Sequence, residues 1–115
     1  MSRRSPEPVG GYVPAPVFSA LGDETRLWLL SRLAAGQPHS IAELTDGSHL
    51  TRQAVTRHLH VLEGAGIVRS IRVGRESRYA FEPQSIAQAQ EYLSQVSAQW
   101  DQALHRLKSF VEDGS

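Results

Sequence analysis

The sequence predicts a mainly α-helical domain that carries one small β-hairpin. Apolar residues recur at helical spacing in several segments, and these segments are bounded by capping residues or glycines. Residues 67–81 are instead rich in β-branched and aromatic residues around a central glycine. The chain has 115 residues, 40% of them hydrophobic, which suits one folded domain and leaves little room for a second.

The N-terminal part of the chain predicts an arm and two helices. Residues 1–14 contain three prolines and two adjacent glycines but almost nothing apolar, so we expect a disordered arm. A short helix is expected over residues 17–21. Asp23 then caps a second helix, which ends before Gly36. The residues expected to face inward from these two helices are Phe18, Leu21, Leu27, Leu30, Leu33 and Ala34.

Two further helices follow, separated by a tight turn. Ser40 and Glu43 form the sequence signature of a capping box, which opens the first of them. Residues 46–48 make the turn, and Thr51 caps the second helix, which is expected over residues 51–62. The residues expected to face inward from this pair are Ile41, Leu44, Val55, Leu59 and Leu62.

A hairpin and a long helix complete the chain. Residues 67–73 and 78–81 predict two strands, joined by a tip that starts with a glycine. Pro83 then opens a final helix over about residues 84–111. The order helix, helix, turn, helix, hairpin is that of a helix-turn-helix with a wing. We expect residues 15–113 to form this single domain.

The charge distribution singles out one segment. The formal net charge of the chain is +0, which would argue against a polyanionic partner. Residues 51–78 nevertheless hold six arginines against two glutamates, a net charge of +4, while the segments on either side are acidic. A neutral chain with one strongly basic segment has a polarised surface, which is the electrostatic footprint of nucleic-acid binding.

Polar side chains gather on one face of the helix that follows Thr51. At about 100° per residue, Leu59 and Leu62 fall within about 40° of Val55 and form the buried stripe. The opposite face carries no acidic residue before Glu63, and its donors suit base edges and phosphates. The alternative is a solvated helix face. The DNA-binding residues that we predict here are Thr51, Arg52, Gln53, Thr56, Arg57 and His60.

The hairpin concentrates four arginines at positions 69, 72, 75 and 78. A wing laid along the DNA backbone or into the minor groove would use such charges. The alternative is a charged edge strand that guards against aggregation. From this segment we predict DNA contacts by Arg72, Arg75 and Arg78, and above all by Arg75 near the tip.

Composition and motifs argue against several other functions. The chain has no cysteine, so disulfides, thiolate metal sites and thiol redox sensing do not apply. His58 and His60 point about 160° apart on one helix and cannot share an ion, and we expect His58 to pack at the border of the core. Asp101 and His105 supply two further candidate ligands. No catalytic constellation is evident, and no stretch approaches ~20 apolar residues. We expect no enzymatic activity, cofactor, bound metal or membrane partner, and a cytoplasmic location.

The final helix carries an unbroken heptad stripe. Its apolar members are spaced alternately by three and four residues: Ile86, Ala89, Leu93, Val96, Trp100, Ala103, Leu107 and Phe110. A small domain cannot cover this stripe alone, so we expect one end to pack on the domain and the rest to meet a second copy. The alternative is a helix folded entirely onto its own core. For the dimer interface we predict Phe18, Leu93, Val96, Trp100, Leu104 and Leu107.

Taken together, three pieces of this sequence resemble the ArsR/SmtB family of bacterial winged-helix repressors. These pieces are LGDETR, LTRQAVTRHLHVLEGAGIV and GRESRY, and the resemblance covers about residues 18–81. It implies a homodimer joined through the first and last helices, with two recognition helices reading an inverted repeat in double-stranded DNA. It also implies repression of a promoter, often the protein's own.

The chain departs from the metal-sensing members that it resembles. Those members carry a cysteine motif on the helix corresponding to residues 41–44, or paired Asp and His ligands on the last helix. Here the last helix offers only Asp101 and His105, so metal sensing is not carried over and the effector is unknown. Two alternatives to a dimeric repressor remain: a winged protein-interaction module without specific DNA binding, and a repressor with a His/Asp metal site.

Overall fold

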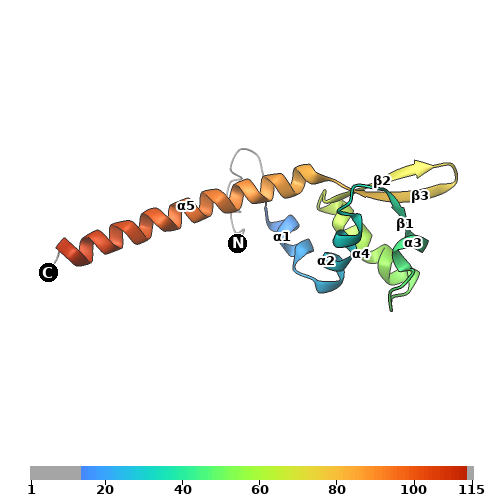
Figure 1. Cartoon of the computed structure of the whole chain (residues 1–115), viewed down its shortest axis with the longest axis horizontal. Helices are drawn as coiled ribbons and strands as arrows, with labels where there is room; N and C mark the ends of the chain where they lie inside the picture. Colours follow the sequence, from blue (N-terminus) through green and yellow to red (C-terminus); the bar gives the residue numbers. More distant parts are fainter. Residues whose placement is uncertain (1–13, 114–115) are drawn as a thin grey trace, which may run out of the picture.

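The computed structural model describes residues 14–113 and shows a winged helical domain from which one long helix extends (Figure 1). The molecule measures 69 × 35 × 24 Å along its principal axes. The arm expected over residues 1–14 lies outside the described residues, apart from Pro14. In chain order the elements are α1 (Ala15–Leu21), α2 (Glu24–Leu33), β1 (His39–Ser40), α3 (Ile41–Thr45), α4 (Arg52–Gly64), β2 (Val68–Val73), β3 (Glu76–Phe81) and α5 (Pro83–Asp113).

The three predicted helix caps are confirmed. The side chain of Asp23 accepts a hydrogen bond at 2.9 Å from the backbone N–H three residues on. Ser40 and Glu43 form the full capping box, with reciprocal hydrogen bonds of 3.1 and 2.9 Å. Thr51 Oγ1 accepts from a backbone N–H at 3.1 Å. Each cap satisfies an amide that the first turn of a helix leaves unpaired, so these residues fix where α2, α3 and α4 begin.

The core forms where α1, α2, α4 and the sheet meet. The predicted inward face of α2 is partly wrong: Leu27 is 50% exposed and Ala34 is exposed, whereas Leu29 is fully buried. In α1 the buried residues are Val17 and Ala20, whereas the predicted Phe18 and Leu21 are half-buried. An apolar-rich helix offers two neighbouring stripes, and packing against α4 selects one of them. The largest fully buried side chains are Leu29, Leu33, Leu44, Val55, Leu59, Leu62 and Ile67.

The sheet has three antiparallel strands in the order β1-β3-β2. Strands β2 and β3 form the predicted hairpin, with Val73 opposite Glu76, so the loop contains only two residues. Gly74 is the first of them and has a φ of 63°, the positive value that a type II′ turn requires at this position. The second strand is therefore two residues longer than expected. Strand β1 was not predicted, and it places His39 in the sheet, opposite Tyr79.

Helix α5 runs for 31 residues, and only its first turns pack on the domain. Ala89 is buried, and the Phe18 and Tyr92 rings lie 6.0 Å apart, which ties α1 to α5. Beyond this point the helix leaves the domain as a rod (Figure 1). The alternative in which it folds entirely onto its own core is therefore wrong. The large apolar side chains that it exposes are Leu93, Trp100, Leu104, Leu107, Phe110 and Val111.

Candidate nucleic-acid interface

Helix α4 separates an apolar face from a polar one. Val55, Leu59 and Leu62 are fully buried, which fixes the rotation of the helix about its axis. The opposite face is open to solvent and lines a shallow hollow of about 530 Å³. The residues that line it are five of the six predicted on this helix, Arg52, Gln53, Thr56, Arg57 and His60. The sixth, Thr51, is exposed and caps the helix.

The polar face of α4 presents hydrogen-bond donors and two positive charges. Thr56 donates its hydroxyl to the Arg52 carbonyl at 2.7 Å, which holds its side chain against the helix. Within residues 14–113 neither Arg52 nor Arg57 takes part in an ion pair, so both guanidinium groups are available to an anionic partner. The N-terminal end of a helix adds partial positive charge beside Arg52. This face therefore suits an anion that also offers acceptor atoms.

Arg26 joins α4 to the first two helices. Its guanidinium donates to the Ala20 carbonyl at 2.6 Å and to His58 Nδ1 at 3.3 Å. It also lies 3.8 Å from the carboxylate of Asp23. His58 is half-buried on the border of the core, as predicted, and it accepts this hydrogen bond rather than facing outward. The bonds set α4 against α1 and α2, so the polar face of α4 is held at a fixed orientation.

The wing arginines differ in what they contact. Arg75 is exposed at the hairpin turn, beside Arg72, whose Nε donates to the Gly74 carbonyl at 3.3 Å. Arg69 lies 3.5 Å from the carboxylate of Glu82 at the far end of the hairpin. Because side chains alternate along a strand, the register places Arg69 on the opposite face of the hairpin from Arg72. The positive charge is therefore spread over both faces of the wing.

Arg78 connects the wing to the helix-turn-helix. Its guanidinium lies 3.7 Å from the carboxylate of Glu43 on α3 and 3.5 Å from that of Glu76 on its own strand. The Nε atom is buried and has no hydrogen bond to any described residue, so the 3.5 Å contact is an ion pair only. Hydrogen bonds from Ser40 lower the pKa of Glu43, and the charge of Arg78 lowers it further. Glu43 therefore stays ionised and holds the wing against α3.

A groove between α3 and the wing, with Arg52 of α4 at one end, brings together three of the predicted arginines. It has a volume of about 580 Å³ and runs from the first turn of α4 to the hairpin. Its basic residues are Arg52, Arg75 and Arg78, and its acidic residues are Glu43 and Glu76. Sequence reasoning missed both acids as partners of Arg78. Strand alternation could have paired Arg78 with Glu76, but the pairing with Glu43 depends on β1.

The described residues contain no group of three or more His, Asp or Glu side chains that could hold a metal ion. Asp101 and His105 are both exposed on the rod of α5. Over the same part of the chain, no helix is both long and apolar enough to span a bilayer.

Comparisons with known proteins agree with this geometry. A family described as a helix-turn-helix domain matches residues 21–71. The uncharacterized HTH-type transcriptional regulator YuzN of Bacillus subtilis is 44% identical over 66 residues, which cover 51% of this chain and 71% of the relative. The HTH-type transcriptional regulator Rv2034 of Mycobacterium tuberculosis is 33% identical over 91 residues, which cover 79% of this chain and 81% of the relative.

A solved structure gives the same result. The ArsR-like transcriptional regulator from Rhodococcus sp. RHA1 superposes with a TM-score of 0.78 at 36% identity, covering 89% of this chain and 96% of that one. The match includes more of the chain than the helix-turn-helix alone. Fold, polar face and relatives agree, and the chain belongs to the ArsR-like winged helix-turn-helix regulators, a class of DNA-binding proteins that control transcription.

Proposed function

We propose that this protein is a dimeric repressor that binds an inverted-repeat operator, with α4 in the major groove and the wing on the DNA backbone. The observation that carries the proposal is the solvent-exposed face of α4, where one shallow hollow is lined by three polar side chains and by two arginines that form no ion pair with residues 14–113. Such a protein acts by binding rather than by catalysis, and we place it in the cytoplasm with its DNA.

The roles of the side chains follow from their positions. Gln53 and Arg57 project from the exposed face in the first two turns of α4 and suit bidentate contacts to adenine and guanine edges. Thr56 and His60 extend that face, while Thr51 and Arg52 at the N-terminal end of α4 suit a phosphate. On the wing, Arg75 suits the backbone or the minor groove. Arg72 and Arg78 add positive charge on its two faces, and Arg78 also holds the wing in place.

We infer that two copies pair through α1 and α5. Trp100 is 65% exposed and Leu93, Leu104 and Leu107 are each more than half exposed, on one helix that extends beyond its own domain. Phe18 on α1 and Val96, which lies between Leu93 and Trp100 in the stripe, are half-buried. The winged helix-turn-helix domain Mb0332 from Mycobacterium bovis, 22% identical to this chain, is described as homodimeric. A second copy would cover the stripe and supply the second recognition helix.

A salt-dependent gel shift on the DNA upstream of the protein's own coding region tests DNA recognition. Wild type should form a discrete complex whose affinity falls steeply as salt rises. Arg57→Ala should weaken this complex by about 1–3 kcal/mol. The matched control is Arg106→Ala, because Arg106 is an exposed arginine on α5 that lies away from the polar face of α4. Equal affinities for Arg57→Ala and wild type would show that α4 does not read DNA with this face.

A further inference from the structure

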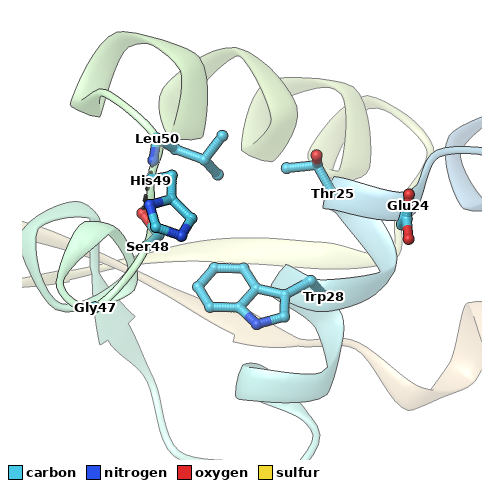
Figure 2. A pocket seen from close by; sticks show the side chains of 7 residues that line it. All are labelled: Glu24, Thr25, Trp28, Gly47, Ser48, His49 and Leu50. Carbon is cyan, nitrogen blue, oxygen red and sulfur yellow. Dashed lines mark hydrogen bonds between the residues drawn. The ribbon is translucent and has the colours of Figure 1, made fainter.

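A second cleft lies between α2 and the turn that joins α3 to α4 (Figure 2). It has a volume of about 440 Å³, within the range of small-molecule sites. None of its residues lines the hollow on the polar face of α4. From α2 it is lined by Glu24, Thr25 and Trp28, and from the turn by Ser48, His49 and Leu50.

The floor of this cleft is a pre-oriented indole. Trp28 is 37% exposed, and the guanidinium of Arg32 lies over its ring at 5.3 Å from the centroid. This cation–π contact holds the ring in place. Figure 2 shows the indole lying across the cleft from His49 and Leu50. The arrangement offers a flat aromatic surface and an aliphatic wall to a planar apolar group.

The rim of the cleft carries one acidic group. Glu24 is exposed and, among the ion pairs of the described residues, it takes part in none. Glu24 and Trp28 are four residues apart on α2, so their Cβ atoms are neighbours at about 6 Å. Among the described residues no lysine or arginine lines the cleft, and the nearby Arg32 guanidinium is engaged by the Trp28 ring and by the carbonyls of α3, which disfavours a nucleic-acid strand or an organic acid. The backbone amide of Arg26, in the first turn of α2, is already bonded to Asp23 and does not attract an anion.

The other wall of the cleft is the turn that leads into α4, and hydrogen bonds tie the start of this turn to α2. Arg32, which covers Trp28, also donates to the carbonyls of Asp46 at 3.0 Å and Glu43 at 3.2 Å, at the end of α3. Ser48 Oγ donates to the Thr45 carbonyl at 2.6 Å and accepts from the Leu50 amide at 3.1 Å. A molecule seated between Trp28 and this turn therefore presses on the segment that leads directly into α4.

We propose that this cleft is an effector site for a small aromatic amine, whose ring stacks on Trp28 and whose protonated nitrogen pairs with Glu24. Occupancy shifts the α3–α4 turn relative to α2 and weakens operator binding. Ligand binding in the cleft does not depend on DNA binding, whereas its regulatory effect rests on the proposed operator binding.

Two probes of similar length and opposite charge test the ligand class. The full-length protein, labelled with ¹⁵N, is titrated with 2-phenylethylamine and with 3-phenylpropanoate while its NMR spectrum is recorded. The amine should shift the Trp28 indole N–H and the amides of residues 47–50, and the acid should bind about tenfold more weakly. Equal affinity of the two probes, or shifts confined to other parts of the spectrum, would overturn the proposal.

Three variants locate the interaction. Glu24→Gln should remove the preference for the amine, while Trp28→Leu keeps apolar cover but removes the aromatic face and should weaken both probes. Leu27→Ala is the control, since Leu27 is exposed on the same helix and does not line the cleft. A Trp28→Leu protein that folds normally and binds the amine as wild type does would contradict the site.

Regulation is tested separately in the gel shift. At saturating 2-phenylethylamine the operator Kd of wild type should rise, and that of Glu24→Gln should rise much less. Wild type that binds operator equally with and without a bound amine would overturn the regulatory role. Because the NMR titration contains no DNA, a failure of operator binding leaves its result unaffected, and the two failures can be told apart.

Discussion

Gln53 and Arg57 lie about one turn apart on the exposed face of α4. Their two side chains prefer different base edges in the major groove. An amide pairs best with adenine and a guanidinium with guanine. Gln53→Ala should therefore relax the preference at one base pair of each half-site, and cost about 1–3 kcal/mol on the specific sequence only. Competition binding with operators substituted one base pair at a time measures this. A uniform loss on every sequence would instead identify Gln53 as a backbone contact.

Arg75 is exposed at the wing turn, and in the proposed complex it contacts phosphates rather than base edges. Arg75→Ala should weaken specific and non-specific DNA binding about equally. The slope of log Kd against log salt should fall by roughly one, because the variant neutralises one phosphate fewer. Arg106→Ala again serves as the charge-matched control. An unchanged slope would mean that the wing turn does not touch the DNA backbone.

At the scale of elements, the helix caps couple stability to pH. The hydrogen bond from the Arg26 backbone lowers the pKa of Asp23 from its ordinary 3.8, and bonds from Ser40 lower that of Glu43 from 4.5. A carboxyl whose pKa is lower in the folded state stabilises the fold above its unfolded pKa. That stabilisation is lost as the pH falls through the folded pKa. The free energy of unfolding should therefore decrease as the pH falls below about 4.5.

Urea denaturation followed by circular dichroism at a series of acidic pH values checks this expectation. The double variant Asp23→Asn, Glu43→Gln keeps hydrogen-bond acceptors but removes both charges. Its stability should be lower at neutral pH and should depend less on pH in the acidic range. The same acid dependence in the variant and in wild type would show that other carboxyl groups are responsible.

The elements that could be predicted well from the sequence are those set by local chemistry. Caps at Asp23, Ser40 and Thr51 fix three helix starts, and Gly74 fixes the hairpin, because each acts within a few residues of itself. The polar face of α4 could also be predicted, because the buried stripe of a helix determines which of its residues face solvent. These residues are enough to place most of the candidate interface from the sequence.

Features set by tertiary packing could not be predicted. Strand β1 contains only two residues and exists because β3 pairs with it. The choice of Leu29 over Leu27 for the core depends on how α2 meets its neighbours. The contact of Arg78 with Glu43 joins two elements that are distant in the chain, and so does the cleft beside Trp28. None of these leaves a periodic signal in the sequence.

For the whole molecule, the length of α5 is the dominant feature. A domain of this size buries only about 60–70% of the surface that its unfolded chain exposes, so it has little stability to spare. The stripe on α5 leaves a tryptophan, a phenylalanine and three leucines more than half exposed. Each large side chain would contribute roughly 1.5–3 kcal/mol on full burial against a second copy. Dimerisation would stabilise the molecule and fix the distance between its two reading helices.

Trp100→Glu tests this pairing. A charge placed in the middle of an apolar interface should give monomers or unfolded protein and abolish operator binding, although no DNA-contacting residue is changed. Gln102→Glu adds the same charge to a position on the other side of the helix and should leave the dimer intact. Light scattering at micromolar concentration measures the mass of each variant. Wild type that is monomeric yet binds an inverted repeat tightly would disprove the role of α5.

Recognition by a dimer means that two copies read one symmetric operator through two α4 helices. Footprinting of the promoter region tests whether the operator is symmetric. The mass of the protein–DNA complex in sedimentation tests whether two copies bind it. We expect two protomers per site and a protected region with dyad symmetry, its half-sites about 34 Å apart or a multiple of that distance. Arg57→Ala should lose both halves of the footprint together. A single protomer bound to an asymmetric site, or protection that Arg57→Ala leaves unchanged, would contradict symmetric recognition through α4.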